Sequence, residues 1–507
     1  MATASLDAAS PIRSALSRVD LLLLFLAAWI PRAIVAAIRP EGGGDWGLSY
    51  LPVALNILHN GCISLSDPAS ALCEPSWGGN QAPGFAAFVA FVSWLLPESQ
   101  LVLVQVQAII IGAAIATVAA MAAQLGRSRV LGLVIGLVLA FSPQHLAWTR
   151  FSSTDPLTIT FSLLLIAALL RGVGQHRLPI WSVALALIGA LAVRFDSVLL
   201  TIPVAVAGFL LHAPLTAIRR GVAIVLILLV PAALWSVRNA AVDLTLLPPE
   251  FFSPKFTRPP GFNHWGYTWT LIEYQYPSWF YDAVEGRYDT IAVDPSNYRT
   301  EEEREESEAA ITRLQAYVGQ DIPGDIDDEF ARIADKRRAI DPLRQWVTSP
   351  LIRMRNLWFN PFNPTAWPYE MSAEVLFKVR EGALWELREG FEREPGPATL
   401  ALVLGVARLV LLGLFAWVLA LTFGRRHRGP WRQFVWLAAS YLVGRTLFFA
   451  YFPLIETRYI MPVTPWLEVA VVLGLRARFW PPRRLDEAVA PGDRSRPLAI
   501  SRGSASA

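Results

Sequence analysis

Eleven apolar stretches of spanning or near-spanning length divide this chain of 507 residues. A run of about 20 apolar residues can cross the hydrocarbon core of a bilayer as a helix. With 54% hydrophobic and only 17% charged residues, the chain has too little polar surface for a soluble domain. The sequence therefore predicts an all-α polytopic membrane protein. The stretches run approximately 19–38, 82–97, 101–124, 130–148, 156–170, 178–193, 195–212, 220–237, 398–423, 432–452 and 459–476.

Basic clusters between these stretches predict the topology. By the positive-inside rule they face the cytoplasm: Arg13 and Arg18, then 126–129, 171–177, Arg219 and Arg220, 424–432 and 476–484. The N-terminus and 126–129 can share one side only if one stretch between them fails to cross. The shortest of the stretches between them, 82–97, would make a helix of roughly 24 Å against a hydrocarbon core of about 30 Å. We therefore expect ten full spans with both termini cytoplasmic, and a dipping or surface helix at 82–97. A full eleventh span is the alternative.

This topology divides the chain into four parts. We expect an N-terminal transmembrane module over 1–240 that includes a first outer loop at 39–81, and a large, mostly helical outer loop domain over 241–397. C-terminal transmembrane helices follow over 398–478, and a disordered cytoplasmic tail over 479–507. The conspicuous polar groups of the chain then converge on the outer face, which in a bacterium is the periplasm.

The first outer loop holds a predicted surface helix and both cysteines of the chain. Its leucines at 48, 51, 55 and 58 recur at helical spacing, and Pro52 would fit only the first turn of such a helix. Cys62 and Cys73 lie outside the membrane by this topology, where a disulfide can persist. A Cys62–Cys73 bridge and two separate thiols both remain open.

The large loop predicts helices over 301–320 and 327–362, joined by proline-rich turns. Its "DID" at 325–327 has the form of a metal-binding DxD motif, but an acidic loop produces that pattern by chance more often than not. The sequence contains no phosphate-binding glycine-rich loop, no Walker lysine motif and no Cys/His metal spacing. Cytosolic nucleotide chemistry is not indicated.

Several stretches, in their order along the chain, resemble one family. An acidic residue after the first span is followed by Tyr, by "ALNILHNG" and by "APGF" before the next apolar segment. Then come "GRSR", "SPQHLAWTRFSSTDPLT", "PAALWSVRN" and "ETRYIMPVTPW". This order is similar to that of the GT-C superfamily of integral-membrane glycosyltransferases. Within it, the pattern resembles the bacterial branch related to protein O-mannosyltransferases and lipid A aminoarabinose transferase, glycosyltransferase family 39.

The resemblance implies transfer of a sugar from a polyprenyl-phosphate donor to an acceptor at the periplasmic face, with inversion. Such a reaction needs a base for the acceptor proton and positive groups for the departing phosphate. Asp45, within "GGGDWGLSYLP", is the predicted catalytic base, and Tyr50 a predicted substrate-binding residue. The structural alternative for Asp45 is to cap the helix that follows.

Asp155 and four arginines complete the predicted substrate site. Asp155 matches a family position that carries an acidic residue; its structural alternative is a place in the capped first turn of a helix, ahead of Pro156. For the phosphate the candidates are Arg150, Arg194, Arg238 and Arg458, because a guanidinium presents a planar fork to phosphate oxygens. Tyr459 would add a hydrogen bond. Alternatively these arginines anchor helix ends or pair with Asp196 and Glu456.

The resemblance also implies the partners and location. A lipid monophosphate can leave without a metal, so we expect no cofactor, although Asp45 and Asp155 together could bind a divalent ion. The partners are the polyprenyl-phosphate sugar donor, an envelope glycolipid, polysaccharide or protein acceptor, and the lipid bilayer, with no nucleic acid. The expected location is the bacterial inner membrane. The alternatives are a transporter or flippase of lipid-linked glycans and an O-antigen polymerase or ligase.

Overall fold

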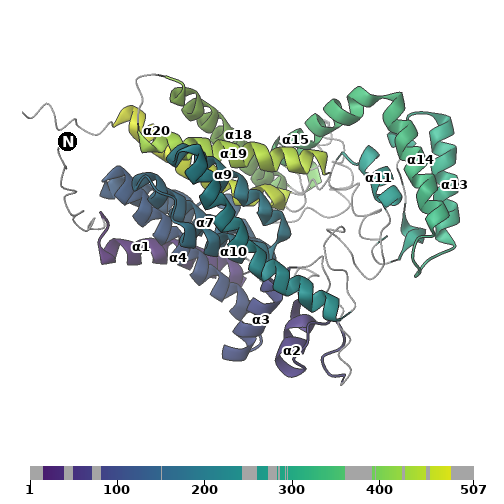
Figure 1. Cartoon of the computed structure of the whole chain (residues 1–507), viewed down its shortest axis with the longest axis horizontal. Coiled ribbons are helices and arrows are strands. Elements are labelled where there is room, and N and C mark those ends of the chain that lie inside the picture. The colour runs from purple at the N-terminus through teal and green to yellow at the C-terminus, as the bar shows by residue number, and fades with distance from the viewer. Residues whose placement is uncertain are drawn as a thin grey trace, which may run out of the picture.

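The computed structural model describes residues 15–38, 50–70, 82–149, 151–242, 260–271, 283, 286–291, 293, 295–359, 391–393, 395–424, 429–452 and 457–480. Within these residues the chain is helical and has no strand (Figure 1). In the described part of the chain, seven helices are long and apolar enough to cross a membrane. The predicted class, an all-α polytopic membrane protein, is confirmed.

Each of the eleven predicted stretches contains a helix. The seven long ones are α1 (Arg18–Ile38), α4 (Gln100–Gly126), α7 (Thr154–Gly174), α10 (Pro214–Ala241), α18 (Pro395–Thr422), α19 (Pro430–Tyr451) and α20 (Thr464–Phe479), which the 3-10 turn η7 (Thr457–Val463) extends. Four apolar helices are shorter: α3 (Gly84–Leu95), α5 (Arg129–Ala140), α8 (Ile180–Val193), and α9 (Thr201–Leu211) with its leading 3-10 turn η2 (Phe195–Leu200). Length alone therefore does not distinguish α3 from α5 or α8.

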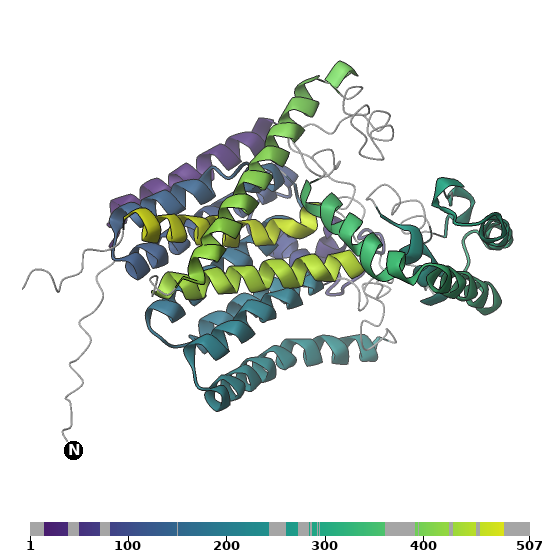
Figure 2. The same cartoon turned by 90° about the horizontal axis from the view of Figure 1, so that it is seen from above.

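Polar contacts define two ends of the helix bundle. At one end, Arg129 at the start of α5 binds Asp20 in the first turn of α1, with 2.7 Å between Nη2 and Oδ1. At the other end, the Gln100 amide at the start of α4 donates to the Ser152 hydroxyl just before α7, at 2.9 Å. We call these the Asp20 end and the Asp155 end. Figures 1 and 2 show the helices formed by residues 301–340 beyond the Asp155 end, away from the first turn of α1.

Both ends of α3 lie at the Asp155 end. Gly84 at its start packs so closely on Ala192, two residues before Arg194, that a Cβ there would lie 2.5 Å from the Ala192 carbonyl oxygen. Leu95 at its end is separated from Gln100 by four residues. The helix therefore does not cross the bundle, and the chain reaches α4 from the same end at which α1 finished. This agrees with the prediction for 82–97.

The polar loop builds a small domain from α11 (Pro260–Trp269), α13 (Glu301–Gln315) and α14 (Gly324–Ile340). Phe330 of α14 packs edge-on against Phe262, with centroids 5.1 Å apart, and against Trp265 at 4.8 Å. The "DID" carboxylates serve this packing. Asp327 accepts a hydrogen bond from the Phe262 backbone N–H at 2.7 Å, and Asp325 pairs with Arg313 of α13 at 2.5 Å.

A further helix, α15 (Ser349–Phe359), joins this domain to the membrane bundle. The buried Arg353 guanidinium donates to the carbonyl oxygens of Tyr267 at 2.5 Å, Thr270 at 2.8 Å and Ala450 at 3.1 Å. Ala450 is the penultimate residue of α19. One side chain thus fixes α11 of the polar domain onto the end of a membrane-spanning helix.

Candidate functional site

Asp155 stands in the first turn of α7, at the end of the bundle that faces the polar domain. Ser153 is the N-cap of this helix and its hydroxyl accepts from the Asp155 N–H, while Pro156 follows in the same turn. The predicted helix start is therefore confirmed. The carboxylate is 3% exposed, and its Oδ2 accepts from the Ser153 hydroxyl at 3.2 Å.

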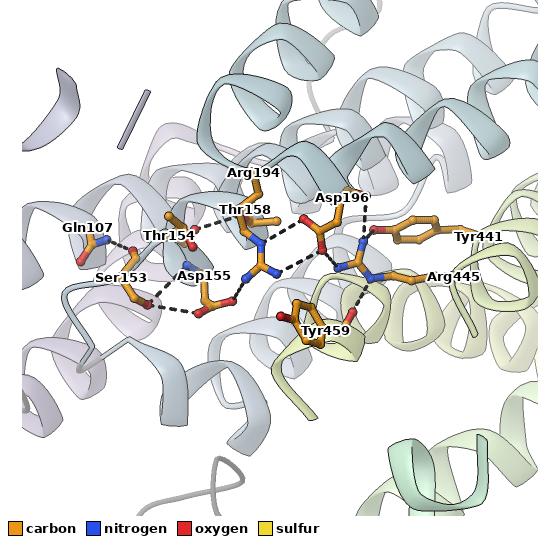
Figure 3. A network of polar contacts seen from close by, with 10 residues as sticks. All are labelled: Gln107, Ser153, Thr154, Asp155, Thr158, Arg194, Asp196, Tyr441, Arg445 and Tyr459. Carbon is orange, nitrogen blue, oxygen red and sulfur yellow. Dashed lines mark hydrogen bonds and ion pairs between the residues drawn. The ribbon is translucent and has the colours of Figure 1, made fainter. Parts of the chain in front are cut away.

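Arg194 connects Asp155 to a second carboxylate (Figure 3). It lies in extended backbone between α8 and η2, which aims its guanidinium across the end of α7. Nη1 donates to Asp155 Oδ1 at 2.5 Å, while Nε and Nη2 grip both oxygens of Asp196 at 3.0 and 3.2 Å. The sequence offered three roles for Arg194: phosphate binding, anchoring of a helix end, and pairing with Asp196. The described structure has the pairing.

Arg445 of α19 continues this chain of charges. It is fully buried, and its Nη2 donates to Asp196 Oδ2 at 2.6 Å. The same guanidinium donates to the Tyr459 carbonyl and to the Tyr441 hydroxyl. Arg445 is not among the site residues predicted from the sequence. The available signal was its position inside an apolar run, since a charge within a membrane segment is costly and marks a built site.

The four charged side chains of this network balance: Asp155 and Asp196 against Arg194 and Arg445. Both carboxylates are engaged by guanidinium donors, Asp155 by Arg194 and Asp196 by Arg194 and Arg445. The network fixes α7, α8 and α19 to one another at the Asp155 end.

Tyr459 lies where this network meets Arg458. Its ring stacks on Phe449, with centroids 4.5 Å apart. The guanidinium carbon of Arg194 lies 5.0 Å from the ring centroid, and that of Arg458 lies 5.4 Å from it. The structure thus brings together four of the predicted site residues: Asp155, Arg194, Arg458 and Tyr459.

Arg238 and Tyr50 are placed around the first loop. The Arg238 guanidinium donates to the Ile63 carbonyl at 2.9 Å and covers the Trp235 ring at 5.0 Å. Tyr50 precedes α2 (Leu51–His59) and meets Phe85 of α3 edge-on, with centroids 4.6 Å apart. No described contact joins either residue to Asp155 or Arg194. The predicted surface helix is present as α2, with proline in its first turn.

The remaining predicted residues have different outcomes. Asp45, Arg150 and Cys73 lie outside the described residues, so their roles stay predictions. Cys62 is disulfide-bonded. Among the described residues, no group of three or more His, Cys, Asp or Glu side chains could hold a metal ion.

An apolar groove of about 220 Å³ reaches the Asp155 end of the bundle. It is lined by residues of α3, α4, α7 and α8 and is partly open to the surroundings. Leu157 lies two positions after Asp155, and Val193 directly precedes Arg194. Thr160 is its one polar lining residue. The groove therefore places an apolar channel against the polar end of the bundle.

A second buried cluster lies between α1, α6 (Pro143–Trp148) and α20. Arg32 is fully buried and donates to the carbonyls of Ala28 and Ala140 at 2.8 and 2.7 Å. The His145 imidazole Nε2 lies 3.9 Å from Glu468 Oε2. These side chains are likewise visible in the sequence as polar residues inside apolar runs, although they are not among the predicted site residues.

These observations define a multi-pass, all-α membrane protein with a polar helical domain and a charged site at one end. No family model matches the chain, and no curated protein matches it. It is similar to the crystal structure of ArnT from Cupriavidus metallidurans bound to undecaprenyl phosphate, at 15% identity and a TM-score of 0.35, over 90% of this chain and 77% of that chain. It is also similar to the crystal structure of the same ArnT in the apo state, at 13% identity and a TM-score of 0.34, over 89% of this chain and 77% of that chain. At these TM-scores neither likeness carries a conclusion about this chain.

Proposed function

We propose that this chain is a membrane glycosyltransferase that moves a sugar from a polyprenyl-phosphate donor to an acceptor at the periplasmic face of the bacterial inner membrane. A donor of this kind has a charged phosphate at the head of a long apolar chain. Its site needs polar groups at the membrane boundary and an apolar path beside them. The proposal rests on the sequence patterns quoted above together with one structural juxtaposition.

That juxtaposition is the groove at the same end of the bundle as the charged network. Leu157 and Val193 line the groove, two positions after Asp155 and one position before Arg194. A volume of about 220 Å³ fits a short stretch of an isoprenoid chain, with the rest of the lipid in the bilayer. The phosphate and sugar would then lie at the Asp155 end, below the polar domain.

Each of the predicted site residues has a separate role in the proposed reaction. Asp45 is the proposed base for the acceptor proton, and Arg458, Arg150 and Arg238 are the candidates for the phosphate. Because Arg194 is engaged by two carboxylates, it acts as a positioning residue that orients Tyr459 and the end of α7. The expected reaction inverts the anomeric carbon and uses no metal.

The first test compares envelope glycans and lipid-linked sugars by mass spectrometry. Cells would carry the wild-type chain, no chain, Asp45→Asn, or Asp67→Asn at matched protein level. Asp67 is the control, because it lies in the same loop and caps the Ala69 N–H at 2.9 Å, a bond that asparagine keeps. We expect Asp45→Asn to match the deletion, with one sugar lost from a product and its polyprenyl-phosphate donor accumulating. Four identical profiles would reject the enzyme and favour lipid transport.

A second test addresses the groove. Leu164→Trp would fill it, while Leu185→Trp on the exposed face of α8 adds the same ring outside it. We expect Leu164→Trp to raise KM for a polyprenyl-phosphate donor several-fold and Leu185→Trp to leave that KM unchanged. An equal effect of the two variants on KM would show that the groove does not hold the lipid chain.

A further inference from the structure

The helical segment that leads into α15 carries exposed apolar side chains in an otherwise polar domain. Leu343 is 67% exposed, Trp346 58%, Val347 46% and Leu351 56%. Large apolar side chains gathered in one place on a protein surface mark an interaction site. We therefore expect these four side chains to contact a partner that covers them.

Their spacing places them on one face of a helix. Residues 342–359 are continuously helical, through the π-helical turn η5 (Arg344–Thr348) and α15. Leu343, Trp346, Val347 and Leu351 stand at positions i, i+3, i+4 and i+8 of this helix, which share a face. No residue of η5 is buried, whereas Pro350, Arg353 and Leu357 further along the helix are buried in the protein.

This apolar face lies at the boundary of the membrane-spanning bundle. The Tyr451 hydroxyl at the end of α19 donates to the Trp346 carbonyl at 3.0 Å. Seven residues further along the helix, Arg353 donates to the carbonyl of Ala450. On α19 itself, Val443, Leu447 and Tyr451 are exposed at i, i+4 and i+8, as expected for a lipid-facing stripe. The apolar face therefore continues the stripe by which α19 meets the lipid.

We propose that Leu343, Trp346, Val347 and Leu351 form an interfacial face that inserts into the outer boundary of the bilayer and holds the polar domain against the membrane surface. The occupant is lipid, because the face is continuous with a lipid-facing helix and includes a tryptophan, which favours the headgroup level. Its hydrogen bonds to α19 set its depth. This inference does not depend on the glycosyltransferase proposal.

The test uses a spin label on the full chain in nanodiscs of phosphatidylethanolamine and phosphatidylglycerol. Val347→Cys carries the label on the interfacial face, and Lys336→Cys carries it on the exposed side of α14. Labelling proceeds without reductant because Cys62 is disulfide-bonded, and the parent chain gives the background. Collision rates are measured with lipid-soluble oxygen and with a water-soluble nickel chelate.

We expect the ratio of oxygen to nickel collisions to be at least threefold higher at 347 than at 336. Leu351→Cys provides a second position on the face if Val347→Cys does not fold. Equal ratios at both positions would overturn the proposal. Protection from both reagents that appears only at high protein-to-lipid ratio would also overturn it, because a second copy of the chain would then cover the face.

Discussion

Arg194, which follows the last residue of α8, meets Asp155 in the first turn of α7 with 2.5 Å between Nη1 and Oδ1. The same guanidinium holds both oxygens of Asp196, which in turn holds Arg445. The chain of charges crosses from α7 through the α8–η2 junction to α19. Arg194, a candidate for phosphate binding from the sequence, is therefore already paired with two carboxylates. The geometry at the polar end of the bundle depends on these pairs.

Removing Arg445 is expected to destabilise the protein strongly. In Arg445→Leu two buried carboxylates share one guanidinium, and breaking a buried pair costs about 3–5 kcal/mol. Thermal unfolding in detergent would report the loss, with Arg219→Leu at an exposed position as the control. The double variant Asp196→Asn, Arg445→Leu should recover part of it, since the uncompensated charge is gone. A double variant no more stable than the sum of the singles would mean that the two residues do not act as a pair.

Arg194→Lys separates positioning from direct phosphate binding. Lysine keeps the charge but cannot present a fork to two carboxylates. We expect turnover to fall by about tenfold, equivalent to ~1.4 kcal/mol in the barrier, with donor KM little changed. Initial-rate kinetics would measure both, with Arg219→Lys as the matched control. A raised donor KM at normal turnover would instead assign Arg194 to the phosphate.

Much of the fold was predictable because the length of an apolar stretch is a local property. The eleven stretches, the first turn of α7 and the failure of 82–97 to cross all follow from hydrophobicity, capping residues and loop charge. These signals need no knowledge of packing.

The site was less predictable because its partners are distant in sequence. Arg445 lies 249 positions from Asp196, and nothing local distinguishes an arginine that will bind phosphate from one that will be paired. The sequence contained the relevant signal at Arg445, a charge inside a span, but not the identity of its partner. For Arg194 the sequence left phosphate binding and pairing with a carboxylate both open, and tertiary packing determines which of these roles the residue has.

Acid is expected to loosen the α13–α14 pair. The hydrogen bond from Lys336 lowers the pKa of Glu306, with Arg332 adding to the effect. A carboxyl whose pKa is lower in the folded state stabilises the fold above its unfolded pKa of about 4.3, and that contribution is lost as the pH falls through the folded value. Hydrogen-exchange protection factors of α13 and α14 amides should therefore fall between pH 6 and pH 3. Glu306→Gln should lack most of that change, and α20 amides should show little. A fall of the same size in Glu306→Gln would mean that other groups carry the acid response.

Gly84 is the point at which α3 packs closely on α8, so adding one methyl group there should change the packing that forms the groove. In Gly84→Ala the new Cβ would lie 2.5 Å from the Ala192 carbonyl oxygen and 2.9 Å from its Cβ, against backbone that cannot turn aside. Overpacking of this kind costs about 1–3 kcal/mol. Gly221→Ala in α10 is the matched control, because no atom lies within 4 Å of its added Cβ, and helix propensity favours alanine there by about 1 kcal/mol. Thermal unfolding should show a higher stability than wild type for Gly221→Ala and a lower stability for Gly84→Ala.

Since Gly84 and Ala192 both line the groove, Gly84→Ala should also raise the KM of a long-chain donor. A Gly84→Ala protein with unchanged stability and KM would mean that α3 is free to move away from α8 without consequence for the groove.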